Sequence, residues 1–577
     1  MAQSSGTTAN IGGEMTSAAG ESFSAPLRLF AIATLVAFVL SLAFSQAANI
    51  TTFYLHRQDR WLLLLGTAIL LLCGWRLPAR AGLPTLSAKA VFACTGLLLL
   101  LTFIGHYLVL SGYDRSRDEQ MASFDAVVFA SGHLVAQLPA LWRDHAEVLN
   151  VSFMYPADSR GAWISSYLPL NAGLRAAFGA ITGPLMTALG AIALWGCVRR
   201  IWPQDKEAAT LALILYAGSA QILVTGMTSY AMPAHLALNL SWLWLFLRGS
   251  WKWDLAALLV GFIAVGLHQP IMHPLFAAPV LITLVRDRAW RRAALYFIGY
   301  AVIGAFWLWW PSFAWGLVQA DPSALRPAGV DFMTRTIEVL KHRDSGGLAY
   351  MLLNFLRLIA WQHLLLLPLM LIGARVTRGN ALAGGLVGGI ILTVFAMAVL
   401  LPYQGHGFGY RYVHGLIGNA ILLAVFGWRA LAQTEVFGQW RSFLVRTTIA
   451  GAFIMIPVQG WMAYAFYAAP AQASQRIDKI DADYAVIGAG DARDAYDLVY
   501  NPPSLNRRPI RLLREALTAK AVQDICAGGP TVTFVGNTTL QPLADFYRTS
   551  SPTADAANAR ITAHFGKAGC RIVEFKP

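Results

Sequence analysis

Charged residues are scarce in this sequence, and their scarcity decides the class of protein. Of the 577 residues 13% are charged and 56% are hydrophobic, and the mean hydropathy is +0.52. Soluble globular domains carry about 25% charged residues, so an ordinary soluble protein is excluded. The composition predicts a multi-pass protein that is surrounded by membrane lipids.

A concentrated basic surface is also missing. The formal net charge is +14, but Lys and Arg are scattered over many short loops instead of one polar domain. This distribution argues against a nucleic-acid partner. A cleavable signal peptide is not expected, because the first apolar run is long and has no clean cleavage site. Residues 1–25 are rich in Ser, Gly, Ala and Thr and are predicted to be disordered.

Apolar runs, by contrast, are abundant, and thirteen of them are long enough to cross about 30 Å of hydrocarbon. They cover roughly residues 28–47, 61–76, 88–110, 178–198, 207–224, 230–247, 253–269, 270–285, 293–318, 348–373, 381–402, 410–431 and 443–468. Basic residues accumulate in cytoplasmic loops, and the connections 225–229 and 268–273 contain no Lys or Arg. This pattern predicts a cytoplasmic N-terminus, with Arg57 and Arg60 in the first outer loop as the exception.

Under this orientation the transmembrane domain covers residues 26–469, with large outer loops at 111–177 and 319–347. In the first loop, DEQMASFDAVVFASGHLVAQLPALWRDHAEV predicts an amphipathic helix lying along the membrane interface. In the second, VDFMTRTIEVLKHR predicts a short helix between Pro-rich and Gly-rich joints, an arrangement typical of a lid.

The polar tail, residues 470–577, is predicted to form a small α/β domain outside the membrane. It alternates strand-like pieces (DYAVIG, TVTFVGN, CRIVEFK) with helical ones (RPIRLLREALTAKAVQDIC, LQPLADFYR, ADAANARITAHFG). Cys526 and Cys570 lie in this tail, where an oxidising compartment favours a disulfide. The segment VIGAGDAR resembles a dinucleotide motif, but Arg493 replaces its third glycine, so we expect no nucleotide there.

An acidic pair, Asp118 and Glu119, follows the third apolar run within SGYDRSRDEQMASFD. A carboxylate beside a loop that can fold over a cavity is suited to act as a general base. The alternative is structural, because acidic residues favour the first turn of a helix, where the helix dipole stabilises them. The residues alone leave both interpretations open.

The segment GLHQPIMHP places His268, Gln269 and His273 at the outer ends of two spans. A metal site is not favoured, because neither a cysteine nor a clear acidic partner accompanies the histidines. We expect these three side chains to line a cavity and to form hydrogen bonds. His235 and His106 are interpreted as packing residues.

The overall pattern resembles the GT-C glycosyltransferases, in particular the branch of the protein O-mannosyltransferases and the lipid A aminoarabinose transferases. The resemblance rests on the acidic pair in the first large outer loop, the helix after it, the return through MYP and SSYLPL, the many spans and the terminal outer domain. It implies that Asp118 is the catalytic base. Two features depart from the family pattern: the acidic pair follows the third span instead of the first, and YRYVHG lacks the usual prolines after its Arg-Tyr pair.

The resemblance also implies a sugar donor on a polyprenyl phosphate and a single displacement with inversion. The departing phosphate then needs cations, and the outer Gly-rich turn PYQGHGFGYRYVHG supplies candidates. Its candidate residues are His406, Tyr410, Arg411 and His414. The alternative for Arg411 is a side chain that reaches to lipid headgroups. Lys341, His342 and Arg343 in the second loop are further candidates.

The expected protein is therefore an inverting glycosyltransferase of a bacterial inner membrane, without a cofactor, that acts on its periplasmic side. Its acceptor would be a lipid, a polysaccharide or a protein of the cell envelope. The alternative function is a transporter or flippase of lipid-linked saccharides. Transporters usually show repeated halves and charged residues at mid-membrane, and neither is evident here. A non-catalytic scaffold would leave the outer Asp, Arg and His residues without a task.

Overall fold

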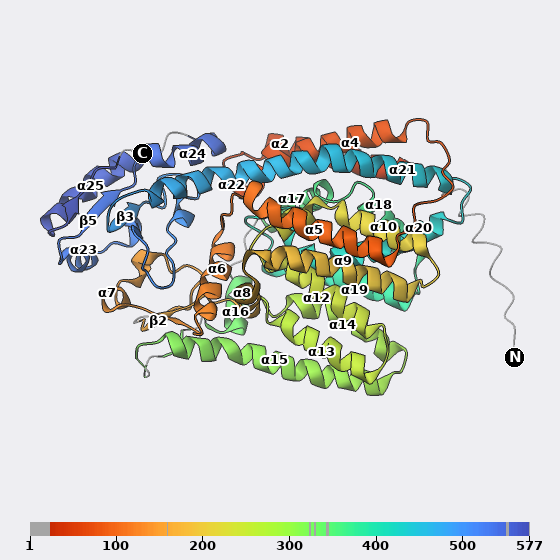
Figure 1. Cartoon of the computed structure of the whole chain (residues 1–577), viewed down its shortest axis with the longest axis horizontal. Coiled ribbons are helices and arrows are strands. Elements are labelled where there is room, and N and C mark those ends of the chain that lie inside the picture. Colours follow the sequence, from red (N-terminus) through yellow and green to blue (C-terminus); the bar gives the residue numbers. More distant parts are fainter. Residues whose placement is uncertain are drawn as a thin grey trace.

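The computed structural model describes residues 24–157, 160–321, 323, 325–327, 330–341, 346–549 and 553–575. The predicted disordered segment 1–25 thus lies almost wholly outside the described residues. The described chain is a large helical bundle, and a smaller part with a β-sheet sits at one end of it (Figure 1). The long helix α22 (Ile456–Asp478) runs from the bundle into that smaller part.

Most helices of the bundle follow one another through short loops. The bundle helices are α2 (Ser24–Ala43), α3 (Ile50–Tyr54), α4 (Arg60–Gly74), α5 (Ala88–Leu108), α8 (Leu170–Phe178), α9 (Thr182–Ile201), α10 (Lys206–Ala217), α11 (Ala220–Gly226), α12 (Met232–Phe246), α13 (Trp251–Val265), α14 (Met272–Arg286), α15 (Trp290–Val318), α17 (Gly347–Ala360), α18 (Leu366–Val376), α19 (Ala381–Leu400), α20 (Ile417–Leu431) and α21 (Phe437–Ala450). The longest connections are those from α5 to α8 and from α15 to α17.

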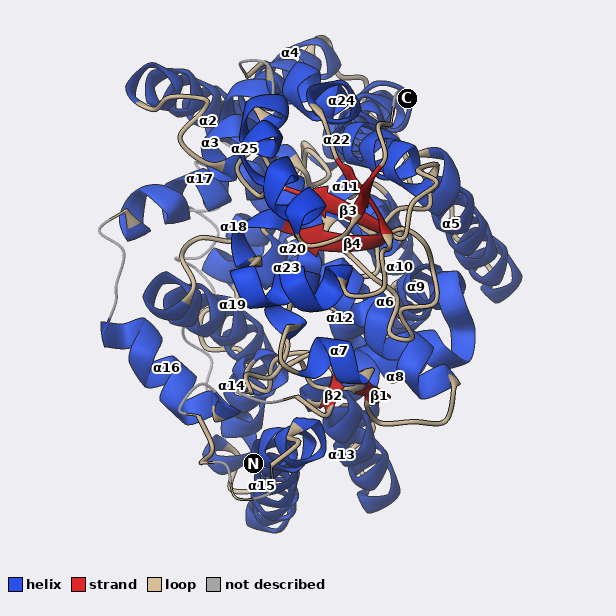
Figure 2. Ribbon diagram, turned by 90° about the vertical axis from the view of Figure 1, so that its left-hand side faces the viewer, coloured by secondary structure: helices blue, strands red, loops and turns tan. Residues whose placement is uncertain are grey.

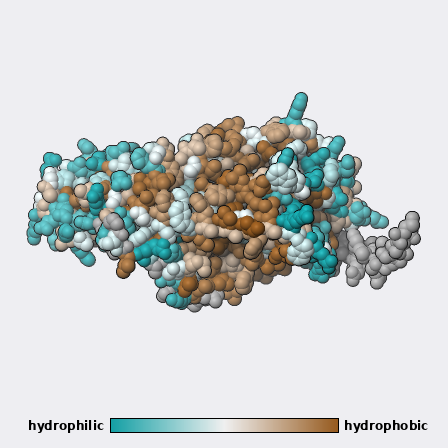
Figure 3. Space-filling view, turned by 90° about the horizontal axis from the view of Figure 1, so that it is seen from below, coloured by the Kyte–Doolittle hydropathy of each residue, from teal (hydrophilic) through white to brown (hydrophobic). Residues whose placement is uncertain are grey.

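Seven helical segments of the described chain are long and apolar enough to cross a membrane, or eight if the bent pair α10–α11 is one span. Three further apolar helices, α14, α17 and α18, are shorter. The apolar surface gathers in a band around the middle of the molecule, with hydrophilic surface at both ends (Figure 3). These features make the chain a multi-pass membrane protein. The number of thirteen spans and the direction of the chain through the membrane stay predictions.

The smaller part is built on a parallel sheet in the order β4-β3-β5-β6, of which β3 and β4 are labelled in Figure 2. Its strands are β3 (Tyr484–Ile487), β4 (Ile510–Leu513), β5 (Thr531–Phe534) and β6 (Arg571–Ile572), and its helices are α23 (Ala519–Cys526), α24 (Asn537–Tyr547) and α25 (Ala554–Lys567). A disulfide joins Cys526 to Cys570. The predicted helix that begins at Arg508 is wrong in its first half, which forms β4. All four β4 residues are buried, Arg511 among them, so the strand lacks the alternation of apolar and polar residues that distinguishes a half-buried strand from a helix.

Loop 111–177, which is predicted to face outward, also differs from its prediction in structure. Helix α6 (Arg117–Ala130) ends much earlier than expected, because Gly132 adopts a φ of +80° directly after it. The chain then forms β1 (Ala136–Gln137), α7 (Ala140–Arg143) and β2 (Ala162–Trp163). Most of α6 is buried, with Phe124 in the same apolar core as Val486 of β3. It is therefore an internal helix and does not lie along an interface. The second predicted loop helix is confirmed as α16 (Phe332–Lys341).

Candidate active site

The N-terminus of α6 separates the two acidic residues of the pair. Ser116 caps the helix: its side chain accepts a hydrogen bond from the Glu119 backbone, and the Ser116 backbone donates to the Glu119 carboxylate at 3.2 Å. Glu119 is buried, and the Tyr467 hydroxyl donates to its carboxylate at 3.0 Å. Burial and the nearby Asp114 raise the pKa of Glu119. Glu119 thus holds the start of the helix and points away from Asp118.

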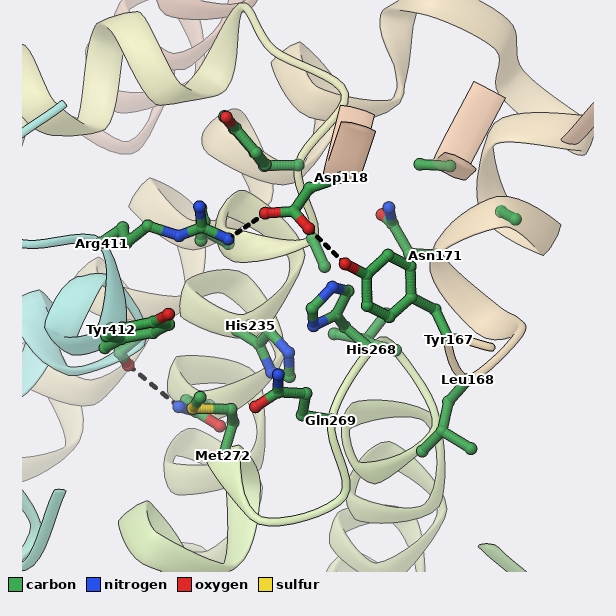
Figure 4. Close-up of a pocket in the computed structure, with 18 of the residues that line it drawn as sticks. Asp118, Tyr167, Leu168, Asn171, His235, His268, Gln269, Met272, Arg411 and Tyr412 are labelled. Carbon is green, nitrogen blue, oxygen red and sulfur yellow. Dashed lines mark hydrogen bonds and ion pairs between the residues drawn. The ribbon is translucent and has the colours of Figure 1, made fainter. Parts of the chain in front are cut away.

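Asp118 points into a cavity and is held there by two side chains (Figure 4). Arg411 Nη2 contacts its Oδ2 at 2.5 Å, and the Tyr167 hydroxyl donates a hydrogen bond to its Oδ1. Burial by itself would raise the pKa of Asp118, but the charge of Arg411, the nearby His268 and the hydrogen bond from Tyr167 lower it to about 2. Asp118 is therefore ionised at any physiological pH.

Arg411 begins a short 3₁₀-helix (Arg411–Leu416) after the Gly-rich turn. Besides Asp118, its guanidinium donates to the carbonyls of Gln404 at 3.1 Å and His406 at 2.9 Å. It also lies over the rings of Tyr230 and Tyr412. These contacts use most of the Arg411 donors within the described part of the chain. Arg411 thus holds Asp118 in place, while its Nε is buried without a hydrogen-bond partner in the described chain. Binding of a departing phosphate by Arg411 stays a prediction.

Four of the predicted site residues line this cavity: Asp118, Arg411, His268 and Gln269. His268 stacks on Tyr167 with 4.0 Å between the ring centroids. Burial lowers the pKa of His268 to about 4, against the opposite effect of Asp118. The imidazole is therefore neutral and can donate one hydrogen bond and accept another.

The other predicted residues lie elsewhere. His273 is buried between Asn239 and Tyr300, each 2.7 Å away. His406 lies 3.9 Å from Asp494 and faces the smaller part of the chain. The remaining three are placed as follows: Tyr410 and His414 are buried within the segment PYQGHGFGYRYVHG, and Lys341 is exposed at the end of α16. His342 and Arg343 lie outside the described residues.

Three residues of the site were missed or misread from the sequence. Tyr167 bonds to Asp118 from 49 residues away, and no local pattern signals such a pair. Arg335 lies on α16, six residues before Lys341, on the face that meets a neighbouring pocket.

The packing role predicted for His106 fits its 2.8 Å contact to the Met227 carbonyl. His235 does not fit that role, because it lines the cavity and neither ring nitrogen has a hydrogen-bond partner among the described residues.

Two further spaces lie near the cavity. Tyr167, Leu168, His268 and Gln269 also line a second pocket, to which α16 contributes Arg335. That pocket shares Pro270, Ile271 and Phe332 with an apolar groove of about 740 Å³ along α14 and α15. Nε of Arg335 is buried without a partner in the described chain, and its Nη2 makes only a long 3.5 Å contact to the Val330 carbonyl. A cationic donor thus lies between a polar cavity and an apolar groove.

The smaller part of the chain reaches both sides of the Asp118–Arg411 pair through residues 494–499. On the α6 side, Asp494 pairs with Arg115 at 2.9 Å, and the Asp497 carbonyl accepts a hydrogen bond from Gln120 at 2.8 Å. On the Arg411 side, the carboxylates of Asp494 and Asp497 lie within 4 Å of His406. Segment 494–499 therefore fixes the relative position of α6 and the Gly-rich turn.

No group of three or more His, Cys, Asp or Glu side chains in the described chain is arranged to hold a metal ion. The expectation that no cofactor is needed stays a prediction.

The fold of the chain is that of the GT-C glycosyltransferases, which confirms the resemblance at the level of the fold. The chain is similar to ArnT from Cupriavidus metallidurans bound to undecaprenyl phosphate, with a TM-score of 0.50 and 12% identity, covering 82% of this chain and 91% of that chain. The apo state of that protein has a TM-score of 0.46 and 13% identity, and the match covers 81% of this chain and 91% of that chain. The oligosaccharyltransferase from Archaeoglobus fulgidus, tethered with an acceptor peptide, has a TM-score of 0.41 and 10% identity. That match covers 79% of this chain and 68% of that chain. No family model and no curated protein matches the sequence.

Proposed function

We propose that this protein is an inverting membrane glycosyltransferase that moves a sugar from a polyprenyl phosphate to an acceptor of the cell envelope, on the periplasmic side of a bacterial inner membrane. The observation that carries the proposal is a row of three adjoining spaces that share lining residues: the apolar groove, the pocket with Arg335 and the cavity with Asp118. A lipid-linked sugar has the same order of chemical groups: an apolar chain, a phosphate and a sugar.

Each of these spaces suits one part of such a donor. The groove along α14 and α15 is lined almost wholly by apolar side chains and fits an isoprenoid chain. Arg335 supplies the charged donor that a phosphate needs. The sugar then enters the cavity that Asp118 lines. The ArnT structure with the same fold is bound to undecaprenyl phosphate, a lipid of this class.

In the proposed reaction the acceptor hydroxyl takes the place beside Asp118 that the Tyr167 hydroxyl occupies in the resting protein. Asp118 accepts the hydroxyl proton while the acceptor oxygen bonds to the anomeric carbon. The bond from that carbon to the phosphate oxygen breaks, and the polyprenyl phosphate leaves with its electron pair next to Arg335. One displacement inverts the anomeric centre, and no covalent enzyme intermediate forms.

Replacing Asp118 with Asn tests the proposal. Membranes that contain the protein would receive decaprenyl phosphate carrying a radiolabelled hexose, and the transfer of label to envelope material would be measured. Loss of a general base lowers turnover by about 10²–10⁴-fold, so we expect transfer by Asp118→Asn to fall to background while its thermal unfolding stays cooperative. Asp144→Asn, an exposed change in the same loop, should transfer label normally. Wild-type turnover by Asp118→Asn would refute the proposal.

A further inference from the structure

Two polar side chains that line the cavity have no partner in the described chain. His235 on α12 is 7% exposed, and both of its ring nitrogens lack a hydrogen bond. Thr393 on α19 is 2% exposed, and its hydroxyl also lacks one. Both residues line the same cavity as Asp118. Figure 4 shows His235 across the cavity from the Asp118–Arg411 pair, next to Gln269.

Unpartnered polar atoms at a buried position are costly, at about 1–3 kcal/mol for each group. Proteins retain them where a ligand or an ordered water completes the hydrogen bonds. Two helices that are distant in the sequence place such atoms around one space. The part of the cavity lining formed by His235, Thr393 and Gln269, called the cavity floor below, therefore has the character of a binding surface that is completed by its ligand.

The chemistry of the floor identifies the kind of ligand. A neutral imidazole, a hydroxyl and a carboxamide can each donate and accept hydrogen bonds. Sugar hydroxyls do the same, whereas a phosphate only accepts and is best matched by cations. The cations near the cavity are at other positions: Arg411 is paired with Asp118, and Arg335 lies in the neighbouring pocket. Asp125, the other carboxyl that lines the cavity, accepts hydrogen bonds from Ser165.

We propose that the cavity floor binds the ring hydroxyls of the transferred sugar, with His235 and Thr393 as its specificity-determining residues. The inference rests on the proposed function, because it assumes that the phosphate lies at Arg335 and the reacting carbon at Asp118. It adds that the substrate is recognised by neutral hydrogen bonds from ring hydroxyls at the floor. A sugar that lacks a hydroxyl facing the floor would leave His235 or Thr393 unpartnered and would be rejected.

Two near-isosteric variants separate a binding role from a structural one. Thr393→Val and His235→Phe remove the unpartnered polar atoms and keep most of the packing volume. Without ligand they should therefore unfold at the same or a higher temperature than the wild type, because a costly buried group is gone. Thr447→Val is the matched control: the Thr447 hydroxyl is fully buried too, but it is bonded within its own helix to the carbonyl of Phe443 at 2.8 Å.

Binding would be measured on the full-length protein in nanodiscs with two kinds of probe: bare decaprenyl phosphate, and decaprenyl phosphate carrying mannose, glucose or galactose. For the wild type we expect at least one sugar to increase the affinity over the bare lipid. In each variant the affinity for the sugar-carrying lipid should fall about three- to tenfold, which corresponds to one hydrogen bond. The affinity of each variant for bare decaprenyl phosphate should not change, and Thr447→Val should bind both kinds of probe like the wild type.

The alternative results are distinguishable. If bare decaprenyl phosphate does not bind the wild type, the proposed function fails. If the lipid binds but no sugar increases the affinity, or if the increase survives in both variants, the floor holds only water and the inference is overturned. A fall in the unfolding temperature of both ligand-free variants would also overturn it, because the polar groups would then support the empty fold.

Discussion

The Tyr167 hydroxyl donates a hydrogen bond to Oδ1 of Asp118, while Arg411 contacts the other oxygen of the same carboxylate. Both bonds favour the ionised form and help to bring the pKa of Asp118 to about 2. A carboxylate with so low a pKa is a weak base. The acceptor hydroxyl must therefore replace one of these bonds before Asp118 can take its proton.

Removing the Tyr167 hydroxyl should shift the pH dependence of transfer. A hydrogen bond to a charged group contributes about 1.5–3 kcal/mol, and about 1.4 kcal/mol changes a pKa by one. In Tyr167→Phe the pKa of Asp118 rises, so the acidic limb of the pH–rate profile should move upward by about one to two pH values. Because Asp118 is still ionised at pH 7, transfer there should stay within about tenfold of the wild type. An unchanged acidic limb would show that Tyr167 does not influence the reacting carboxylate.

Arg335 and Lys341 lie on the same helix, but only Arg335 lines the pocket next to the cavity. If Arg335 binds the phosphate, Arg335→Gln should raise the KM for the decaprenyl phosphate donor by about tenfold or more, the equivalent of one charge-assisted hydrogen bond. Lys341→Gln removes an exposed charge and should change KM less than twofold. Equal effects of the two changes would indicate a general electrostatic attraction of the lipid and no defined site.

Asp494 and Asp491 give a matched pair in one loop of the smaller part. Asp494 contacts Arg115 before α6, whereas Asp491 pairs with Arg514 at 2.5 Å, away from the site. Asp494 has a φ of +63°, which Asn also adopts readily, so Asp494→Asn changes charge without straining the backbone. Both Asn variants should lose roughly 3 kcal/mol of stability through a broken ion pair. Only Asp494→Asn should lower kcat, by about tenfold, with an unchanged KM for the lipid.

The opposite outcome for Asp494→Asn and Asp491→Asn would give the smaller part a purely structural role. Equal kcat values in the two variants, at equal stability, would mean that segment 494–499 supports the fold without positioning Asp118.

Asp497 should make the stability of the protein depend on pH. Burial and the nearby Asp494 raise its pKa to about 7, against the opposing charges of Arg115 and Arg117. In the unfolded chain an Asp has a pKa of about 3.9. Between these values the folded protein retains a proton that the unfolded chain has lost, so Asp497 lowers the stability progressively as the pH rises from about 4 to 7.

Asp497→Asn removes this dependence. Its unfolding temperature should match the wild type near pH 4 and exceed it by several degrees at pH 8, as measured by differential scanning fluorimetry. A variant that is less stable than the wild type at pH 8 would show that ionised Asp497 is stabilised in the fold, by His406 for instance.

Local patterns predicted the parts of the site that depend on neighbours in the chain. The step from an apolar run to SGYDRSRDEQ placed Asp118 at the start of a helix, and the Gly-rich turn placed Arg411 before a span. The same patterns could not separate Asp118 from Glu119, because both acids suit a first helical turn. They also misjudged His235, since whether a histidine in an apolar helix has a partner depends on the helices that pack against it.

The sequence by itself determined that this chain is a multi-pass membrane protein, because so many apolar residues with so few charges cannot be covered by one soluble core. It also determined the GT-C resemblance, which depends on the order of spans and loops along the chain. Only the tertiary structure decided that Arg411 is paired with Asp118, and that Arg335 is the cation next to the apolar groove. Hydrogen bonds reach about 3 Å, so contacts between residues hundreds of positions apart are set by helix packing and leave no local pattern in the sequence.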